Sequence, residues 1–140
     1  LQDAVGADHV TAIPWSQKLF DERIGAEIHN QVLGFAHAIR NFGPSWRWMA
    51  FVDVDEFIVP QTDKTVPEVL DRLGDFGCLS LPWAMFGRCG HTEPPEGGIL
   101  GNYNLRNRDA TQTPRVLKYK CIVDPCRVTA VQVHAGPTWK

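Results

Sequence analysis

The chain has 140 residues, 44% of them hydrophobic and 21% charged, which is enough for one domain with its own core. Its formal net charge is -2 and it has no block of basic residues, which argues against a surface that binds nucleic acid through phosphates. No apolar stretch approaches the roughly 20 residues of a membrane-spanning helix, so we expect membrane association only through segments outside this chain.

The first half of the sequence predicts alternating strands and helices. In chain order we expect the end of a helix over 1–7, a short strand over 9–15, a helix over 24–41, a strand over 48–59 and a helix over 65–73. The predicted helix over 24–41 has apolar residues at helical spacing. Thr65 suits the N-cap of the predicted helix over 65–73.

The second half predicts a more antiparallel arrangement. We expect a strand over 77–83, a loop over 86–98, a strand or a short helix over 99–105, and strands over 115–123 and 127–134. The fold class is therefore α/β, with a mixed sheet flanked by helices in a single domain over 1–140. Because the chain opens on the end of a helix, we expect a first strand–helix unit to lie upstream of it.

Four cysteines are spread along the sequence. They are Cys78, Cys89, Cys121 and Cys126. None forms a Cys-x-x-Cys pair, so the sequence gives little support for a zinc site. Reduced cysteines that serve packing are the favoured interpretation, although the even number also permits disulfides.

The most informative segment is the apolar run over 48–59, which leads into three acids, Asp53, Asp55 and Glu56. A run of this kind is typical of a strand buried on both faces. In an extended strand side chains alternate, so Asp53 and Asp55 would share one face and Glu56 would point to the other. Carboxylates cannot be buried without a partner, so these acids need water, a cation or a metal.

Two carboxylates on one face suit a hard divalent cation, Mg²⁺ or Mn²⁺, that takes substrate phosphates as further ligands. The alternative is a solvated strand end with ordinary acidic residues. Glu56 could orient a ligand, but we favour an ion pair between Glu56 and an arginine such as Arg47 or Arg40.

The ordered set of motifs resembles glycosyltransferase family 92 and a related bacterial family-2-like group. The residues that carry the resemblance are Gln31, Trp48, Asp53-Val54-Asp55-Glu56-Phe57, Pro60, Trp83-Ala84-Met85-Phe86-Gly87, Lys120 before an apolar strand that ends at Pro125, and His134. The resemblance runs from about Leu1 to His134. The family's first strand, which contacts the nucleotide, would lie upstream of Leu1.

The resemblance implies a GT-A fold and a metal-dependent transferase that moves a sugar from a nucleotide-sugar, most naturally a UDP-sugar, to an acceptor hydroxyl with inversion. Asp53, Asp55 and His134 would bind the metal, Mn²⁺ or Mg²⁺. Gln31, Trp83 and Lys120 would lie on the donor side. A glycan or another hydroxyl compound would be the acceptor.

An inverting transferase needs a general base, and the 86–98 loop offers three candidates besides Asp109 in another polar loop. Glu93 is preferred over His91 and Glu96 because it closely follows the aromatic–glycine element. Trp83 and Phe86 could form a stacking platform for an acceptor sugar, or they could pack in the core without a function of this kind.

Two other functions compete with the transferase. A phosphohydrolase with an Asp-x-Asp nucleophile is disfavoured by Phe57, where that class carries threonine or valine. A non-catalytic carbohydrate- or metal-binding fragment is the stronger alternative.

A cytoplasmic location is favoured if the protein is bacterial, and the Golgi lumen if it is eukaryotic.

Overall fold

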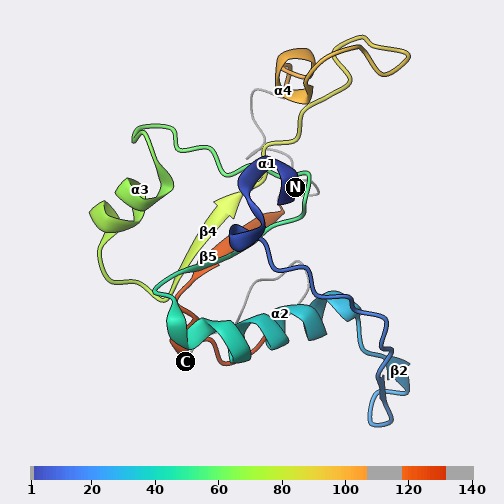
Figure 1. The fold of residues 1–140 in the computed structure, drawn as a ribbon, viewed down its shortest axis with the longest axis vertical. Helices are drawn as coiled ribbons and strands as arrows, with labels where there is room; N and C mark the ends of the chain where they lie inside the picture. Colours follow the sequence, from blue (N-terminus) through green and yellow to red (C-terminus); the bar gives the residue numbers. More distant parts are fainter. Residues whose placement is uncertain (1, 107–117, 132–140) are drawn as a thin grey trace.

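A computed structural model describes residues 2–106 and 118–131 (Figure 1). In chain order the elements are α1 (Gln2–Val5), η1 (Ala7–His9), β1 (Phe20–Asp21), β2 (Ala26–Glu27), α2 (Asn30–Phe42), η2 (Gly43–Ser45), β3 (Met49–Phe51), α3 (Val66–Leu73), β4 (Cys78–Pro82), α4 (Ile99–Asn102), β5 (Tyr119–Val123) and η4 (Pro125–Arg127). Here η denotes a short 3₁₀ helix.

The main sheet has the strand order β3-β5-β4, and both pairings are antiparallel. The central strand β5 contributes three of the buried hydrophobic residues, Cys121, Ile122 and Val123, and Leu70 of α3 is also buried. Strand β5 is therefore the centre of the small core that the described residues form.

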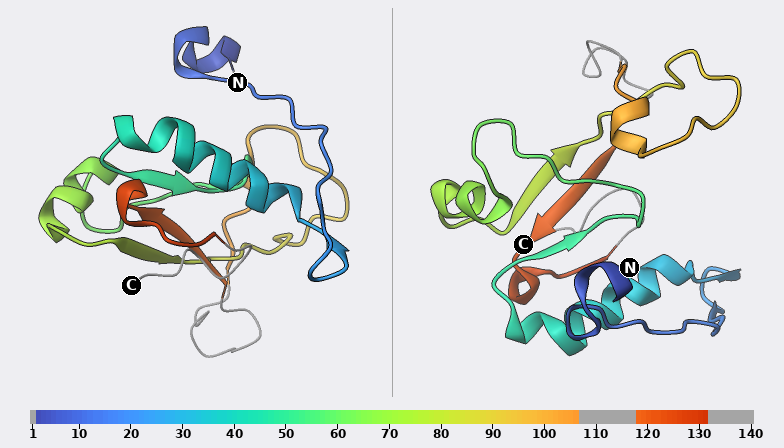
Figure 2. Two further views of the ribbon diagram at one scale, coloured as in Figure 1. Left: turned by 90° about the horizontal axis from the view of Figure 1, so that it is seen from below. Right: turned by 45° about the horizontal axis from the view of Figure 1, so that its top comes forward.

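Strands β3 and β4 run in the same direction, because each is antiparallel to the strand between them. The chain connects them through α3, and β5 enters between them from much later in the sequence (Figure 2). The predicted α/β class with helices beside a sheet is confirmed, and the arrangement is consistent with a fragment of a GT-A-like domain.

Helix α2 begins six residues later than the predicted start at Ile24. Residues 20–27 instead form the β1–β2 hairpin, in which Phe20 pairs with Glu27. Gly25 has a φ of 64°, a backbone conformation that suits glycine in this tight turn. His29 then caps α2, because its Nδ1 accepts a hydrogen bond from the Gln31 N–H at 3.2 Å. The strand predicted over 9–15 is wrong, because the segment after η1 adopts no regular structure.

Helix α3 follows the prediction closely. Thr65 is its N-cap, and a capping box joins Thr65 to Glu68, whose carboxylate accepts the Thr65 N–H at 3.0 Å. The signals that define this helix are all local in sequence.

Strand β3 is much shorter than the predicted run over 48–59. It pairs with β5 over three residues, and Ala50 between Met49 and Phe51 is exposed, so the expectation of burial on both faces is wrong. The chain then turns, with the Glu56 N–H donating to the Asp53 carbonyl at 3.1 Å. The turn keeps Asp53 and Asp55 in contact with solvent, so these carboxylates are not buried without partners.

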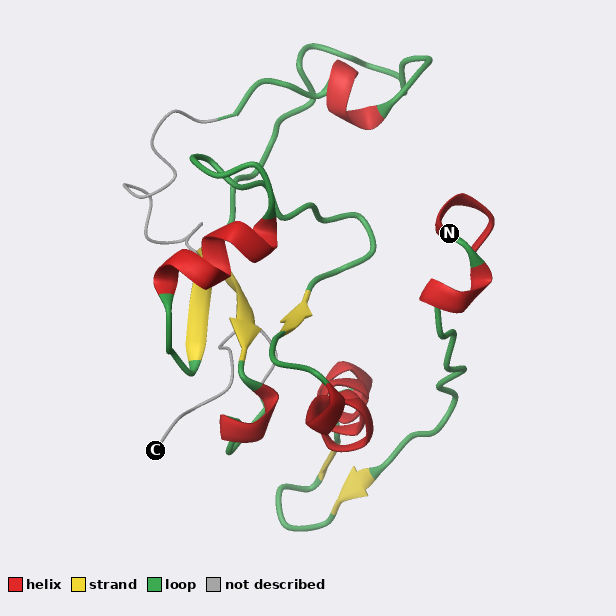
Figure 3. Cartoon of the chain, turned by 60° about the vertical axis from the view of Figure 1, so that its left-hand side comes forward, coloured by secondary structure: helices red, strands yellow, loops and turns green. Residues whose placement is uncertain are grey.

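An arm over residues 83–106 extends beyond the sheet and carries α4 at its far end (Figures 1 and 3). Its two sides are joined by a bridge between Phe86 and Arg106. The predicted loop over 86–98 is confirmed. The segment over 99–105, predicted as a strand or a short helix, contains helix α4.

The last predicted strand is not present in the described part of the chain. Residues 125–127 form η4, and 128–131 have no regular structure. The remainder of that strand, 132–134, and the start of the strand predicted over 115–123 lie outside the described residues.

Across residues 2–106 and 118–131 no helix combines the length and the apolar character needed to cross a membrane. All four cysteines have free thiols.

Candidate functional site

Three segments that are distant in sequence meet around the carboxylate of Asp53. Lys120 of β5 places its Nζ 2.7 Å from Asp53 Oδ2 and 3.2 Å from Glu56 Oε2. Gln31, in the first turn of α2, donates from Nε2 to Asp53 Oδ1 at 3.1 Å. Both oxygens of Asp53 are therefore held by side chains from other elements.

The 53–56 turn also holds itself together. Glu56 Oε2 accepts the Asp53 N–H at 3.1 Å, while the Glu56 N–H donates to the Asp53 carbonyl. A carboxylate that binds both a backbone N–H and an ammonium group makes two charge-assisted hydrogen bonds. Glu56 is thus the anchor of the turn that presents Asp53.

Burial differs among the charged groups of this site. The side chains of Lys120 and Glu56 are 16% and 14% exposed, whereas that of Asp53 is 42% exposed. Burial by itself would lower the pKa of Lys120, but the hydrogen bonds to Asp53 and Glu56 outweigh it and raise the pKa above its ordinary value. The lysine is therefore held charged by the acids.

Glu56 corrects the expectation drawn from strand alternation. Asp53 and Glu56 both reach the same Lys120 Nζ, so they do not lie on opposite faces, because the chain turns at these residues instead of continuing as a strand. The expected ion pair exists, but its cation is Lys120 rather than an arginine. Arg47 pairs instead with Asp75 at 3.4 Å.

The second acid of the motif, Asp55, is exposed. Within the described residues it has no hydrogen-bond or ion-pair partner. Asp53 and Asp55 supply hard oxygen donors of the kind that Mg²⁺ and Mn²⁺ prefer, so the chemistry of the donor set fits such a cation.

No third ligand completes this set in the described part of the chain, where no group of three or more His, Cys, Asp or Glu side chains is arranged to hold a metal. His134, predicted as the third ligand, lies outside the described residues. The carboxylate oxygen Glu56 Oε1 is buried and has no hydrogen-bond partner.

Trp83 follows β4 and lies beside Lys120 of β5 and Lys118, which directly precedes that strand. Its indole ring centre is 5.4 Å from Lys118 Nζ and 5.9 Å from Lys120 Nζ, within the range of a cation–π contact. The Trp83 N–H also donates to the Lys118 carbonyl at 2.9 Å. Two of the predicted donor-side residues, Trp83 and Lys120, are thus neighbours, and the third, Gln31, joins them through Asp53.

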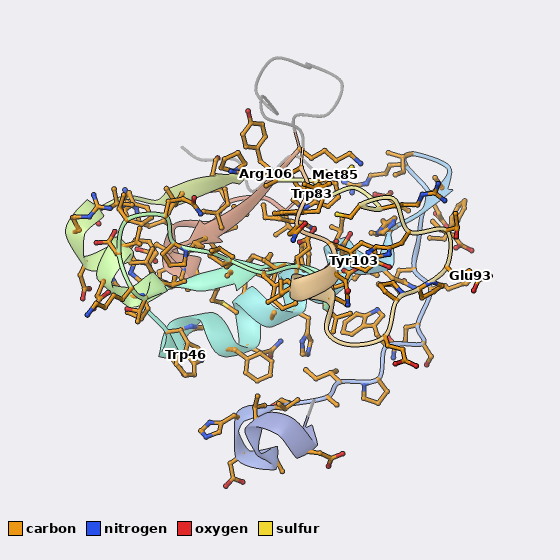
Figure 4. All side chains as sticks on the ribbon, turned by 90° about the horizontal axis from the view of Figure 1, so that it is seen from above. Trp46, Trp83, Met85, Glu93, Tyr103 and Arg106 are labelled. Atoms are coloured by element: carbon orange, nitrogen blue, oxygen red, sulfur yellow. The ribbon has the colours of Figure 1, made fainter. Side chains whose placement is uncertain are left out.

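Glu93, the predicted base, is exposed and lies at the outer end of the arm, apart from Trp83 (Figure 4). His91 in the same loop packs against Tyr103, with their ring centres 5.7 Å apart. In the described part of the chain, neither Glu93 nor His91 contacts the Asp53 cluster.

The contacts of Gln31 and Lys120 with Asp53 were missed by reasoning from the sequence, which assigned both residues to the donor. One signal was available for Lys120, since it is the only charged residue of an otherwise apolar strand. A cation in that position needs an acidic partner. No local spacing could identify that partner, which lies 67 positions away.

Comparison with known proteins places these residues in a family. The sequence model of glycosyltransferase family 92 matches residues 1–140. A relative in Oryza sativa subsp. japonica, "Glycosyltransferase family 92 protein Os08g0121900", is 31% identical over 83 residues, which cover 55% of this chain and 14% of the relative. The matched region is thus a small part of that relative. No solved structure matches the chain.

Proposed function

Since this chain belongs to glycosyltransferase family 92, we propose that it forms part of a catalytic domain that transfers a sugar from a nucleotide-sugar donor, a UDP-sugar, to an acceptor hydroxyl. The observation that carries the proposal is the Asp53 carboxylate, held by Gln31 and Lys120 at the surface of the sheet. Because Gln31 restrains this carboxylate, less side-chain entropy is lost when it binds a ligand.

The proposed cofactor is Mn²⁺ or Mg²⁺, held by Asp53 and Asp55 with His134 as the third ligand. Such an ion offsets the negative charge of a diphosphate leaving group. The two aspartates and Glu56 carry three negative charges and Lys120 one positive charge, so the site as a whole attracts cations.

The chain's own residues would orient the substrates. Gln31 and the 53–56 turn fix the Asp53 carboxylate, because each restrains it through a hydrogen bond. Trp83 would supply an aromatic face for a sugar or base ring. Lys118, which is exposed and adjoins Trp83, carries a charge suited to a phosphate.

Glu93 stays our proposed general base for an inverting transfer, with His91 and Glu96 as the other candidates of the loop. For this role the arm has to move toward Asp53, because Glu93 lies at its outer end (Figure 4). Loops that close over substrates are common in enzymes of many classes.

Binding of UDP in the presence of Mn²⁺, measured by titration calorimetry, tests the proposal. We expect Asp53→Asn and Asp55→Asn each to weaken binding at least tenfold, and Asp71→Asn, an exposed acid of α3, to leave it unchanged. Mn²⁺-independent UDP binding, or equal binding by all four proteins, contradicts the proposed metal site.

A non-catalytic carbohydrate- or metal-binding role is the second candidate, and the position of Glu93 away from Trp83 favours it. The two functions are distinguished by whether the protein releases UDP from a UDP-sugar when an acceptor is added. UDP release by the wild type that is lost in Asp53→Asn supports the transferase. Binding without release in the full chain supports the second role.

A further inference from the structure

We infer that Lys120 is an internal counter-cation of the proposed metal site: its ammonium group competes with a divalent cation for the carboxylate of Asp53. This inference rests on the proposed function, and it assigns to Lys120 a part in regulating metal affinity rather than in binding the donor. It follows from the position of Nζ between two carboxylates.

The geometry places Lys120 where it competes with a divalent cation for the Asp53 carboxylate. Its Nζ lies 2.7 Å from Asp53 Oδ2, a strong charge-assisted contact, and the side chain is largely buried. A cation that binds Asp53 encounters this positive charge at close range, and repulsion between like charges in a partly buried site is screened only weakly. A metal ion that binds Asp53 therefore either weakens the Lys120–Asp53 contact or binds less tightly because of the lysine's charge.

Glu56 gives the lysine a second position. Its Oε2 lies 3.2 Å from Lys120 Nζ, and its other oxygen, Oε1, is buried without a hydrogen-bond partner. Lys120 can therefore give up Asp53 and still be paired with a buried carboxylate that has unused capacity. The buried charge stays compensated, which removes the main cost of breaking such a pair.

The same charges argue against the alternative that Lys120 binds the donor diphosphate. Lys120 already contacts two carboxylates, and a diphosphate would bring further negative charge to a site with a surplus of acids. Lys118 has no acidic partner within the described residues and is exposed, so it suits that contact better.

The test is the affinity of the full chain for Mn²⁺ alone, measured by titration calorimetry and by electron paramagnetic resonance of the free ion. We expect Lys120→Met to bind Mn²⁺ about three- to tenfold more tightly than the wild type, because one repelling charge is removed from a partly exposed site. Glu56→Gln should bind several-fold more weakly, because Lys120 then has Asp53 as its only carboxylate.

Lys118→Met is the matched control, since it makes the same change of charge two residues away, beside the same Trp83 ring. Its Mn²⁺ affinity should change less than twofold. Because Lys120→Met leaves Glu56 buried and unpaired, the double variant K120M/E56Q removes both charges together. This double variant should bind Mn²⁺ about three- to tenfold more tightly than Glu56→Gln alone.

The outcomes separate the two proposals. If the wild type binds Mn²⁺ and removal of Lys120 leaves the affinity equal or weaker in both backgrounds, Lys120 is no competitor, while the metal site stands. An effect of Lys118→Met as large as that of Lys120→Met also overturns the inference, since general charge then suffices. If no variant binds Mn²⁺, the proposed metal site and this inference fail together.

Discussion

At the scale of single residues, Lys120 shows how a buried charge organises a site. It reaches the acids Asp53 and Glu56 from the central strand of the sheet, and these acids raise its pKa despite its burial. The raised pKa means that the folded state binds the lysine proton more tightly than the unfolded state does. The ion pair therefore contributes stability only while Lys120 is charged.

The pH dependence of stability follows from that sign. The stabilisation by Lys120 is fully present below the ordinary lysine pKa of about 10.4 and is lost as the pH rises through the higher pKa of the folded state. We therefore expect the difference in unfolding free energy between the wild type and Lys120→Met to narrow as the pH rises above about 10.4. Urea unfolding followed by circular dichroism measures it. A constant difference would mean that the lysine's charge does not stabilise the fold.

Cys121 illustrates burial that outweighs the effect of a neighbouring charge, Lys120. Burial and the neighbouring Cys78 raise the pKa of the Cys121 thiol to about 11, so about one thiol in a thousand is ionised at pH 8. Cys126 is exposed. We expect iodoacetamide at pH 8 to label Cys126 readily and Cys121 far more slowly, as followed by mass spectrometry of peptides. The difference should vanish in denaturant, and rapid labelling of Cys121 in the folded protein would contradict its burial.

At the scale of elements, two glycines near α2 have opposite roles. A Cβ on Gly43 would lie 2.8 Å from the Cβ of Pro125, so this glycine allows η2 and η4 to approach closely. A Cβ on Gly34, in the middle of α2, would meet nothing within 4 Å outside the helix's own turns. The first position is constrained by packing and the second is not.

Alanine substitution separates the two cases. We expect Gly43→Ala to destabilise the protein by about 1–3 kcal/mol through overpacking. Gly34→Ala should stabilise it by up to about 1 kcal/mol, because glycine disfavours the helix interior. Midpoints of urea unfolding measure both, and each variant is the control for the other. Destabilisation by both would mean that the space around Gly34 is needed.

Elements with local signals were predicted well, and those that depend on pairing were not. The capping box at Thr65 and Glu68 defines α3 from adjacent residues. The apolar run after Trp48 predicted a long strand, but a strand extends only as far as its partner, and β5 pairs with just Met49–Phe51. The hairpin over 20–27 replaced the predicted first turn of the helix, and it is held by local bonds: the Gly25 N–H donates to the Asp21 carbonyl at 2.9 Å, and Arg23 pairs with the Asp21 carboxylate.

At the scale of the whole molecule, the core that the described residues form is small. Among the described residues four hydrophobic side chains are buried, while large apolar residues such as Val54, Ile24 and Leu100 are mostly exposed. In the described part of the chain, these apolar side chains therefore stay accessible to water.

Dye binding should report these exposed apolar side chains. We expect binding of anilinonaphthalene sulfonate to be measurable under native conditions, because Val54, Ile24 and Leu100 are accessible to solvent. Fluorescence of the dye measures it, and the absence of any increase would show that these side chains are covered in solution.

The sequence by itself determined the α/β class, α3 with its cap, β4 and the family, because these depend on local patterns and on the order of motifs along the chain. It also singled out Asp53, Asp55 and Lys120 as residues of interest. The tertiary structure alone decided that Lys120 and Gln31 hold Asp53 and that Glu56 shares the same lysine. These contacts join residues 22 and 67 positions apart, and their pairing depends on how the strands assemble, which no local spacing encodes.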